Sequence, residues 1–384
     1  MARLARSLLR NTLGTLAVLG MAASPLLADD GASILKHLKN ISVLTSTVPA
    51  NGDLNPYGLV RIARTAGNLQ QGNYLVSNFN NSQNLQGTGT TIVQVSPGGA
   101  FSTFAQIDAS TLPGPCPGGV GLTTALAVLR TGWVIVGSLP TSDGTSATAQ
   151  AGCLIVLDSY GNAVQTIYGA LINGPWDMAF SDDDHSAVLF ITNVLDGTVA
   201  ANGNVVQTAT VVRVNLTVSE KQMPYLDSLT LVGAGFSART DPVALVIGPT
   251  GLGLSPDSGQ PGQFFDRDEP VLYVADTLNS RVAVITDPFK RSTPSWNGQT
   301  LTSGGSLNGP LGLTVAPNGH IITVNGNDGF ATETTPGGRQ IATKQLDNSG
   351  SPVPGAGNLF GVLFDPENGL IFVDDGTNTL NKLQ

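Results

Sequence analysis

The chain has 384 residues, enough for two ordinary domains or for one large domain made of β-strands. Its 47 glycines and 23 prolines interrupt short apolar runs, and only 12% of the residues are charged, a composition typical of turn-rich β-proteins. The formal net charge of −9 argues against nucleic acid as a partner, because an acidic surface repels a phosphate backbone.

Residues 1–28 have the pattern of a secretory signal peptide. Three arginines precede an apolar run, residues 13–23, that is too short to span a bilayer, and Ala28 offers a small residue at a cleavage point. Cleavage would leave 15 basic and 27 acidic side chains, a net charge of −12. We expect an extracytoplasmic protein, periplasmic or secreted, with no transmembrane segment in the mature chain. The alternative is an uncleaved N-terminal anchor.

Cys116 and Cys153 are the two cysteines of the chain. In an oxidising compartment such a pair indicates one disulfide bond. The bond would close a loop of about 36 residues, which the chain-entropy model values at about 3–4 kcal/mol. A zinc or redox role has little support, because there is no Cys-x-x-Cys motif and only three histidines occur.

One pattern, apolar residues that end in a small polar residue, occurs six times along the chain. Each copy is short, rich in β-branched or aromatic residues and bounded by turn residues, as expected of a strand covered on both faces. Another apolar strand with its own turn-like entry precedes each copy, and one or two strands follow it. The copies are residues 74–78, 134–138, 189–193, 272–276, 321–325 and 371–375.

Three to four antiparallel strands per unit, repeated six times, predict an all-β fold, a six-bladed β-propeller over residues 41–384. The last unit ends after its third strand, near residues 379–383, while residues 41–48 form an isolated strand ahead of the first unit. We expect this N-terminal strand to complete the last blade and remove an exposed edge. Residues 29–40 form a lead-in with a short helix, and residues 255–270 an insertion in the fourth blade. Five or seven blades are the alternatives.

The fourth unit is the most specific motif in the chain. Residues 272–285 read Leu-Tyr-Val-Ala-Asp-Thr-Leu-Asn-Ser-Arg-Val-Ala-Val-Ile and resemble the NHL repeat, in which Tyr-Val-Ala-Asp leads through Asn and Arg into the next strand. The resemblance implies that Asp276, Asn279 and Arg281 brace a turn. NHL propellers include protein- and sugar-binding modules and the lyase domain of peptide-amidating enzymes. Calcium-dependent lactonases and streptogramin lyases are distant relatives, so the fold alone does not choose a function.

The entry loops and the ends of the repeated strands are expected on one face of the disc, because each inner hairpin returns the chain to the face it left. Trp176, Asp177 and Asp241 lie on entry loops at this face. The strand ends place a polar ring beside them, formed by Asn78, Ser138, Asn193, Asp276, Asn325 and Asp375.

Carboxylate and amide oxygens are the ligands that Ca²⁺ prefers. Asp276, Asp375, Asn193 and Asn325 are therefore the candidate metal ligands of the polar ring. The alternative is that small polar residues at strand ends cap loops by hydrogen bonding to the backbone.

The related enzyme classes require residues that this chain does not place suitably. The lactonase pattern requires a glutamate at the start of an inner strand, whereas all four glutamates are expected in loops or outer positions. The lyase patterns require histidines in the channel. Here His37 precedes the propeller, and His185 and His320 fall at hairpin turns expected on the opposite face.

Two functions from different classes remain. The favoured one is a binding or scaffold module for a protein, peptide or glycan, with Tyr57, Trp176 and Phe360 as an aromatic platform. Packing of these three rings inside the channel is the alternative to a platform. The second function is a divalent-metal-assisted hydrolase or lyase, in which a cation on the polar ring polarises a carbonyl or lowers the pKa of a water molecule.

Overall fold

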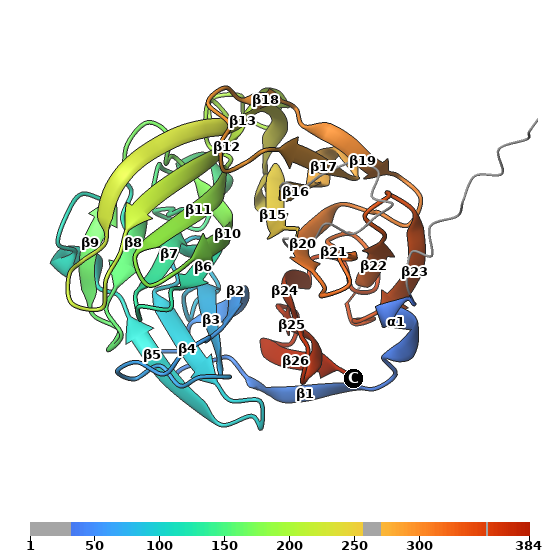
Figure 1. Cartoon of the computed structure of the whole chain (residues 1–384), viewed down its shortest axis with the longest axis horizontal. Helices are drawn as coiled ribbons and strands as arrows, with labels where there is room; N and C mark the ends of the chain where they lie inside the picture. Colours follow the sequence, from blue (N-terminus) through green and yellow to red (C-terminus); the bar gives the residue numbers. More distant parts are fainter. Residues whose placement is uncertain (1–31, 256–269, 351) are drawn as a thin grey trace, which may run out of the picture.

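The computed structural model describes residues 32–255, 270–350 and 352–384, and the predicted signal peptide and most of the predicted insertion lie outside these ranges. Six antiparallel sheets are arranged around a central axis, which makes the protein a six-bladed β-propeller, as predicted (Figure 1). None of the described helices has the length and apolar character needed to cross a membrane.

Each blade runs from an innermost strand at the axis to an outermost strand at the rim. Blade 1 comprises β2 (Leu54–Arg61), β3 (Tyr74–Asn80), β4 (Thr91–Val95) and β5 (Phe101–Gln106). Blade 2 comprises β6 (Leu122–Val128), β7 (Val134–Ser138), β8 (Cys153–Leu157) and β9 (Ala163–Ile167). Blade 3 comprises β10 (Pro175–Asp182), β11 (Ser186–Asn193), β12 (Val206–Thr217) and β13 (Tyr225–Asp241), extended by β14 (Leu245–Ile247) and β18 (Ser295–Trp296).

The other three blades have four strands each. Blade 4 comprises β15 (Pro249–Leu254), β16 (Val271–Asp276), β17 (Arg281–Thr286) and β19 (Gln299–Ser303). Blade 5 comprises β20 (Pro310–Val315), β21 (Ile321–Asn325), β22 (Phe330–Thr334) and β23 (Gln340–Gln345). Blade 6 comprises β24 (Leu359–Asp365), β25 (Gly369–Asp374), β26 (Thr379–Leu383) and β1 (Ile41–Ser46).

The N-terminal strand closes the ring. β1 pairs antiparallel with β26, with Ile41 opposite Leu383 and Ser46 opposite Thr379. Figure 1 shows β1, in blue, beside the red C-terminal strands. This pairing confirms the predicted closure, and it supplies blade 6 with the outer strand that its own segment of chain lacks.

The lead-in segment is held on blade 5 by a buried carboxylate. Glu333 accepts hydrogen bonds from the hydroxyl of Ser33 (2.6 Å) and from the N–H groups of Ile34 and Leu35 (both 2.9 Å), at the start of α1 (Ile34–His37). Its other contact is the imidazole of His320, 2.6 Å away. Burial opposes ionisation of Glu333, but the hydrogen bonds, first that of His320, lower its pKa to about 2. The N-terminal segment therefore contacts two blades.

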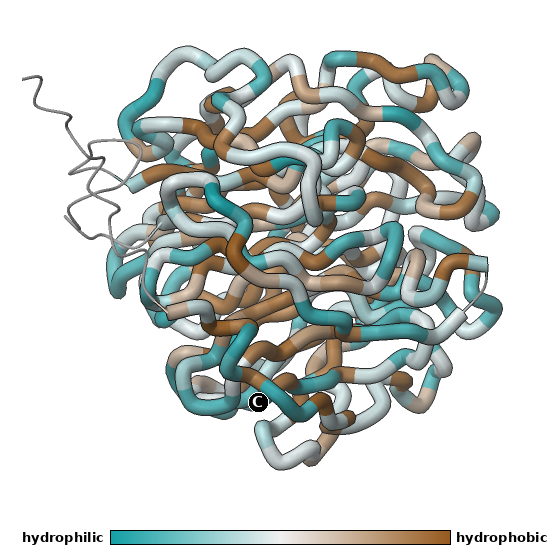
Figure 2. Tube along the Cα trace, turned by 90° about the vertical axis from the view of Figure 1, so that its right-hand side faces the viewer, coloured by the Kyte–Doolittle hydropathy of each residue, from teal (hydrophilic) through white to brown (hydrophobic). Residues whose placement is uncertain are grey.

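Apolar side chains fill the spaces between neighbouring blades. The middle strands β4, β7, β8, β16 and β21 are buried along their whole length, which explains why they lack the polar alternation of a half-exposed strand. Figure 2 shows hydrophobic stretches running through the body of the molecule and hydrophilic stretches mostly at its periphery.

The predicted disulfide is confirmed. Cys116 and Cys153 are bonded, with their Cα atoms 5.1 Å apart. Cys116 lies on the loop that enters blade 2, and Cys153 is the first residue of β8, so the bond ties the entry loop to the third strand of the same blade.

The entry to blade 4 differs from the sequence prediction. The sequence predicts Asp241 on an entry loop, but Asp241 is the last residue of the 17-residue strand β13. Asp241 Oδ1 accepts hydrogen bonds from the N–H groups of Val243 (2.8 Å) and Ala244 (3.0 Å), which is the side-chain turn typical of aspartate. The inner strand β15 begins only at Pro249, after the short strand β14.

Candidate functional site

Strand pairing defines one equivalent position at the start of every inner strand. Pro56, Leu122, Pro175, Pro249, Pro310 and Leu359 occupy it, and they pair with Asn78, Ser138, Asn193, Asp276, Asn325 and Asp374, respectively. Five of the six predicted ring residues therefore share one level of the propeller. In blade 6 the equivalent residue is Asp374, and the predicted Asp375 follows it directly.

Two asparagines of this ring cap the entry loops of their own blades. Asn193 Oδ1 accepts hydrogen bonds from the backbone N–H groups of Asn173 (3.2 Å) and Gly174 (3.3 Å). Asn325 Oδ1 accepts one from the N–H of Asn308 at 3.1 Å. Both asparagines are at most 1% exposed, so their oxygens serve the backbone.

Ser138 and Asn78 have the same kind of role. The hydroxyl of Ser138 accepts a hydrogen bond from the N–H of Gly121 (3.0 Å) and donates one to the carbonyl of Gly119 (2.8 Å). Asn78 donates to the carbonyl of Thr47 (3.1 Å), just beyond β1. Ser138 and Asn78 therefore bind backbone groups of loops, which is the alternative to metal binding given by the sequence.

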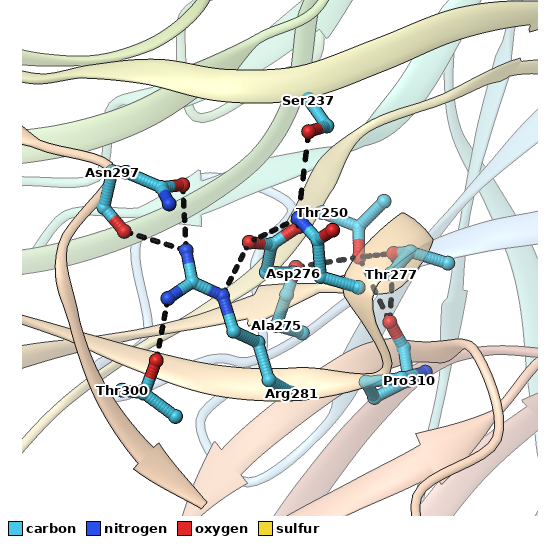
Figure 3. A network of polar contacts seen from close by, with 10 residues as sticks. Ser237, Thr250, Ala275, Asp276, Thr277, Arg281, Asn297, Thr300 and Pro310 are labelled. Carbon is cyan, nitrogen blue, oxygen red and sulfur yellow. Dashed lines mark hydrogen bonds and ion pairs between the residues drawn. The ribbon is translucent and has the colours of Figure 1, made fainter. Parts of the chain in front are cut away.

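Asp276 forms the centre of a buried ionic network in blade 4 (Figure 3). Its Oδ2 lies 2.7 Å from Nε of Arg281, and the side-chain amide of Asn279 is 3.0 Å from both carboxylate oxygens. Arg281 also donates to Thr300 Oγ1 (2.7 Å) and to the carbonyl and side-chain oxygens of Asn297 (both 2.6 Å). The three residues thus brace the turn between β16 and β17.

The four candidate calcium ligands do not provide a set of available oxygens. Asp276 is paired with Arg281, and Asn193 and Asn325 bind the backbone. For Asp375, burial and then the neighbouring Asp374 raise the pKa to about 8, which disfavours the charged form that binds a cation. Within the described ranges, no group of three or more His, Cys, Asp or Glu side chains could hold a metal ion. The four candidate ligands therefore do not fit a calcium site.

The three aromatic residues predicted as a platform pack against one another and are buried. Tyr57 stacks between Phe79 (ring centroids 4.5 Å apart) and Phe360 (3.9 Å), and Trp176 lies 6.1 Å from Tyr57. Tyr57 and Trp176 are each 2% exposed and Phe360 is 5% exposed, so no ring is presented to solvent as a platform. Burial, with a smaller effect of Asp375, raises the pKa of Tyr57 well above its usual value.

Loops close the channel above these rings. Leu139, Val194, Leu245 and Val246 belong to loops or to the short strand β14, and all four are buried in the same apolar cluster as Tyr57. These four side chains therefore cover the entry end of the channel.

Four of the six inner strands carry glycine two residues after the equivalent position that pairs with the polar ring. These glycines are Gly58, Gly251, Gly312 and Gly361. A Cβ atom on Gly312 would lie 1.9 Å from the carbonyl oxygen of Phe360, and one on Gly361 would lie 2.4 Å from that of Tyr57. A Cβ on Gly251 would lie 2.3 Å from the carbonyl oxygen of Leu311, and one on Gly58 would lie 3.0 Å from that of Thr123. In these four blades the inner strand approaches the next one backbone to backbone, a spacing that suits glycine.

Thr124 and Asp177 replace glycine at this position in blades 2 and 3. The hydroxyl of Thr124 donates to the carbonyl of Trp176, and Asp177 Oδ2 accepts a hydrogen bond from the N–H of Leu252 at 2.9 Å. Each side chain therefore contacts the inner strand of the following blade. Asp177 is the one acidic residue among the six, and it lies in β10, whereas the sequence placed it on an entry loop.

A cavity of about 60 Å³ lies on the axis at this level. Among the residues that the structure describes, Asp177 is the one ionisable residue of the lining. The other lining residues are Leu59, Thr124, Trp176, Met178, Gly251, Leu252, Leu311, Gly312, Leu313, Phe360, Gly361 and Val362. Burial raises the pKa of Asp177 from 3.8 to about 7, although hydrogen bonds from the N–H groups of Leu252 and Met178 act in the opposite direction. A carboxyl group of this pKa both donates and accepts protons near neutral pH.

No protein-family model and no curated protein matches this sequence. Solved structures share its fold. A calcium-binding protein, regucalcin, from Agrobacterium tumefaciens has 14% identity and a TM-score of 0.53 over 90% of this chain and 93% of that one. A gluconolactonase from Xanthomonas campestris has 13% identity and a TM-score of 0.52, over 90% and 89%. A streptogramin B lyase has 11% identity and a TM-score of 0.51, over 92% and 99%. The likeness shows the fold alone.

The raised pKa of Asp177 predicts a pH-dependent effect on stability. A carboxyl group whose pKa is higher in the folded than in the unfolded state favours folding below pH 4, and this contribution is lost as the pH rises toward 7. Asp177→Asn stays neutral at every pH. We expect it to unfold at nearly the same urea concentration as the wild type at pH 4, and to be more stable by about 4 kcal/mol at pH 8.

The matched control is Asp227→Asn, which removes an exposed carboxylate outside the cavity. It should show no such divergence between pH 4 and pH 8. Equal stability of Asp177→Asn and wild type at both pH values would mean that the Asp177 carboxyl is ordinarily solvated.

Proposed function

We propose that this chain is an exported, lactonase-like hydrolase that cleaves a small uncharged ester or cyclic ester at the axial cavity, with Asp177 as the general acid–base. The observation that carries the proposal is the place of Asp177: it is the one ionisable residue that lines the cavity, and its pKa is about 7. The gluconolactonase and streptogramin lyase of similar fold are enzymes, which supports catalysis over scaffolding.

The lining of the cavity supports an uncharged substrate. Apart from Asp177, the walls consist of apolar side chains, glycine and one threonine, and they include no lysine, arginine or histidine. An anionic substrate would have to lose its hydration beside a carboxyl group and without a cation to pair with, which is costly. The negative net charge of the whole chain also disfavours an anionic substrate.

In the proposed reaction, Asp177 carries out the proton transfers. The N–H of Leu252 holds Oδ2 of Asp177, so the carboxyl group has a fixed orientation toward the cavity. In its charged form, Asp177 accepts a proton from a water molecule as the water oxygen bonds to the ester carbonyl carbon. The same proton then passes to the leaving oxygen as the carbon–oxygen bond of the ester breaks, and Asp177 returns to its starting state.

The binding-module function has less support, because the aromatic rings that would form its platform are buried. A calcium-dependent form of the chemistry rests on the name of one protein of similar fold, since the candidate ligands here are occupied or bear a raised pKa. Export is part of the proposal, and the disulfide between Cys116 and Cys153 is consistent with an oxidising compartment.

A panel of neutral and anionic lactones and esters, followed by acid release in a pH-stat, tests the function. We expect hydrolysis of neutral members only, with a rate that rises as the pH passes 7. Asp177→Asn should lower kcat/KM by about 10²–10⁴-fold, the usual contribution of a general base. The control Asp227→Asn should keep wild-type activity, and full activity of Asp177→Asn on a neutral ester would refute the assignment.

A further inference from the structure

The cover over the entry end of the channel consists of two pairs of segments. In the first pair, residues 81–90 and 139–152, the N–H of Thr141 donates to the carbonyl of Gly87 (2.9 Å) and its hydroxyl donates to that of Gln86 (2.5 Å). In the second pair, residues 194–205 and 240–247, the N–H of Gly203 donates to the hydroxyl of Thr240 (2.9 Å). Each pair is held together internally.

The two pairs meet along a seam where Leu139 and Ala149 of the first pair share an apolar cluster with Val194 and Leu245 of the second, and few hydrogen bonds cross it. Among the described residues, one hydrogen bond joins them, from the side-chain amide of Gln86 to the carbonyl of Val243 at 2.5 Å. A groove of about 260 Å³ also lies between them. It is lined by Ala149 and Ala151 of the first pair, by Leu195, Gly197, Val199 and Ala200 of the second, and by Asn173.

The second pair carries a strained residue at the seam. Leu245 has a φ of +61°, in the left-handed region that a bulky side chain rarely adopts, and its side chain is 1% exposed in the cluster above Tyr57. Val243, two residues earlier, is 77% exposed. Backbone strain of this kind persists only where surrounding contacts hold it, and it is typical of ligand clamps and switch regions.

We propose that the two segment pairs separate along this seam and open the entry end of the channel, so that a ligand passes Trp176 and reaches Asp177. The cavity of about 60 Å³ holds only a few water molecules, whereas ligand pockets are typically about 300–1,000 Å³. Binding of an organic molecule at Asp177 therefore requires expansion. The identity of the ligand as an ester rests on the proposed function, but the movement of the cover does not.

Trp176 reports on the opening directly, because it lies beneath the cover and is 2% exposed. With Trp133→Phe and Trp296→Phe in place, Trp176 is the one tryptophan of the chain. We expect Gln86→Ala to raise the quenching of its fluorescence by acrylamide about fivefold, since the hydrogen bond across the seam is lost. Gln83→Ala, which alters an exposed glutamine of the same loop, is the matched control and should leave quenching unchanged.

A cross-link across the seam gives the opposite result. Gln86→Cys with Val243→Cys, joined by a short bifunctional thiol reagent, should reduce quenching below the wild-type value, because the link holds the seam closed. The two native cysteines do not react with the reagent, since they are bonded to each other. Hydrogen exchange of the unsubstituted protein gives a second measurement, in which residues 240–247 should exchange faster than β11. Unchanged quenching in both variants, or equal exchange of cover and blade, would overturn the proposal.

The cross-linked protein also separates this inference from the proposed function. If the wild type hydrolyses neutral esters, the cross-link should abolish turnover, and cleavage of the linker should restore it. Altered quenching without hydrolysis of any ester would leave the opening intact and refute the function. Hydrolysis at the wild-type rate by the cross-linked protein would refute the opening and leave the function intact.

Discussion

Arg281→Ala is expected to lower the free energy of unfolding by about 3–5 kcal/mol, the usual result of removing one partner of a buried ion pair. The side chain of Asp276 is 0% exposed and that of Arg281 is 9% exposed, so water cannot replace the lost guanidinium (Figure 3). The substitution also leaves Thr300 and Asn297 without the donors that they contact in the native protein. Urea unfolding followed by circular dichroism measures the effect.

Arg130→Ala is the matched control. Arg130 lies 3.8 Å from Asp182 and is 61% exposed, so its loss should cost at most about 1 kcal/mol. Adding Asp276→Asn to Arg281→Ala should restore part of the stability, because it removes the unpaired buried charge. A loss in Arg281→Ala no larger than in Arg130→Ala would show that Asp276 and Arg281 do not brace blade 4.

The double substitution Cys116→Ser with Cys153→Ser is expected to lower the free energy of unfolding by about 4 kcal/mol. The two residues are 37 apart in sequence, and the chain-entropy model gives a loop of this length about that stabilisation. The measurement is the midpoint of urea unfolding of the variant, compared with that of the oxidised protein. Blade 2 should still form, since β7 and β8 keep their strand pairing.

Wild-type protein unfolded and measured under reducing conditions is the control for the serine hydroxyls. It should match the double variant, because both lack the covalent link. If the variant unfolds at the same urea concentration as the oxidised wild type, then the loop between the two cysteines is already restrained in the unfolded chain.

The architecture could be predicted from the sequence because its signals are local. A buried middle strand needs five or so apolar, β-branched residues followed by a turn, and that pattern is readable in one blade at a time. The predicted strands at residues 134–138 and 321–325 coincide with β7 and β21 for this reason. Ring closure could be predicted because the last unit has only three strands of its own, and the strand at residues 41–48 precedes the first unit without a partner there.

The site could be predicted only in part, because it depends on contacts between blades. Five of the six polar ring residues share one level, but no local pattern decides between metal binding and loop capping by Asn193 and Asn325, and none predicts the cover above Tyr57. The role of Asp177 did have a signal. Gly58, Gly312 and Gly361 each lie two residues after the equivalent paired position of their inner strand. Asp177 occupies the same place in blade 3 and interrupts this series of glycines.

The pairing of β1 with β26 has a consequence for how the protein is made. Leu383 follows Ile41 by 342 residues in the chain, so β1 is synthesised long before its partner β26. During synthesis β1 has no place in a sheet, and a strand in that condition pairs readily with other chains. The pairing that protects an edge of the finished ring thus leaves β1 without its partner until β26 has been made, whereas each of the other blades takes its first four strands from one stretch of chain.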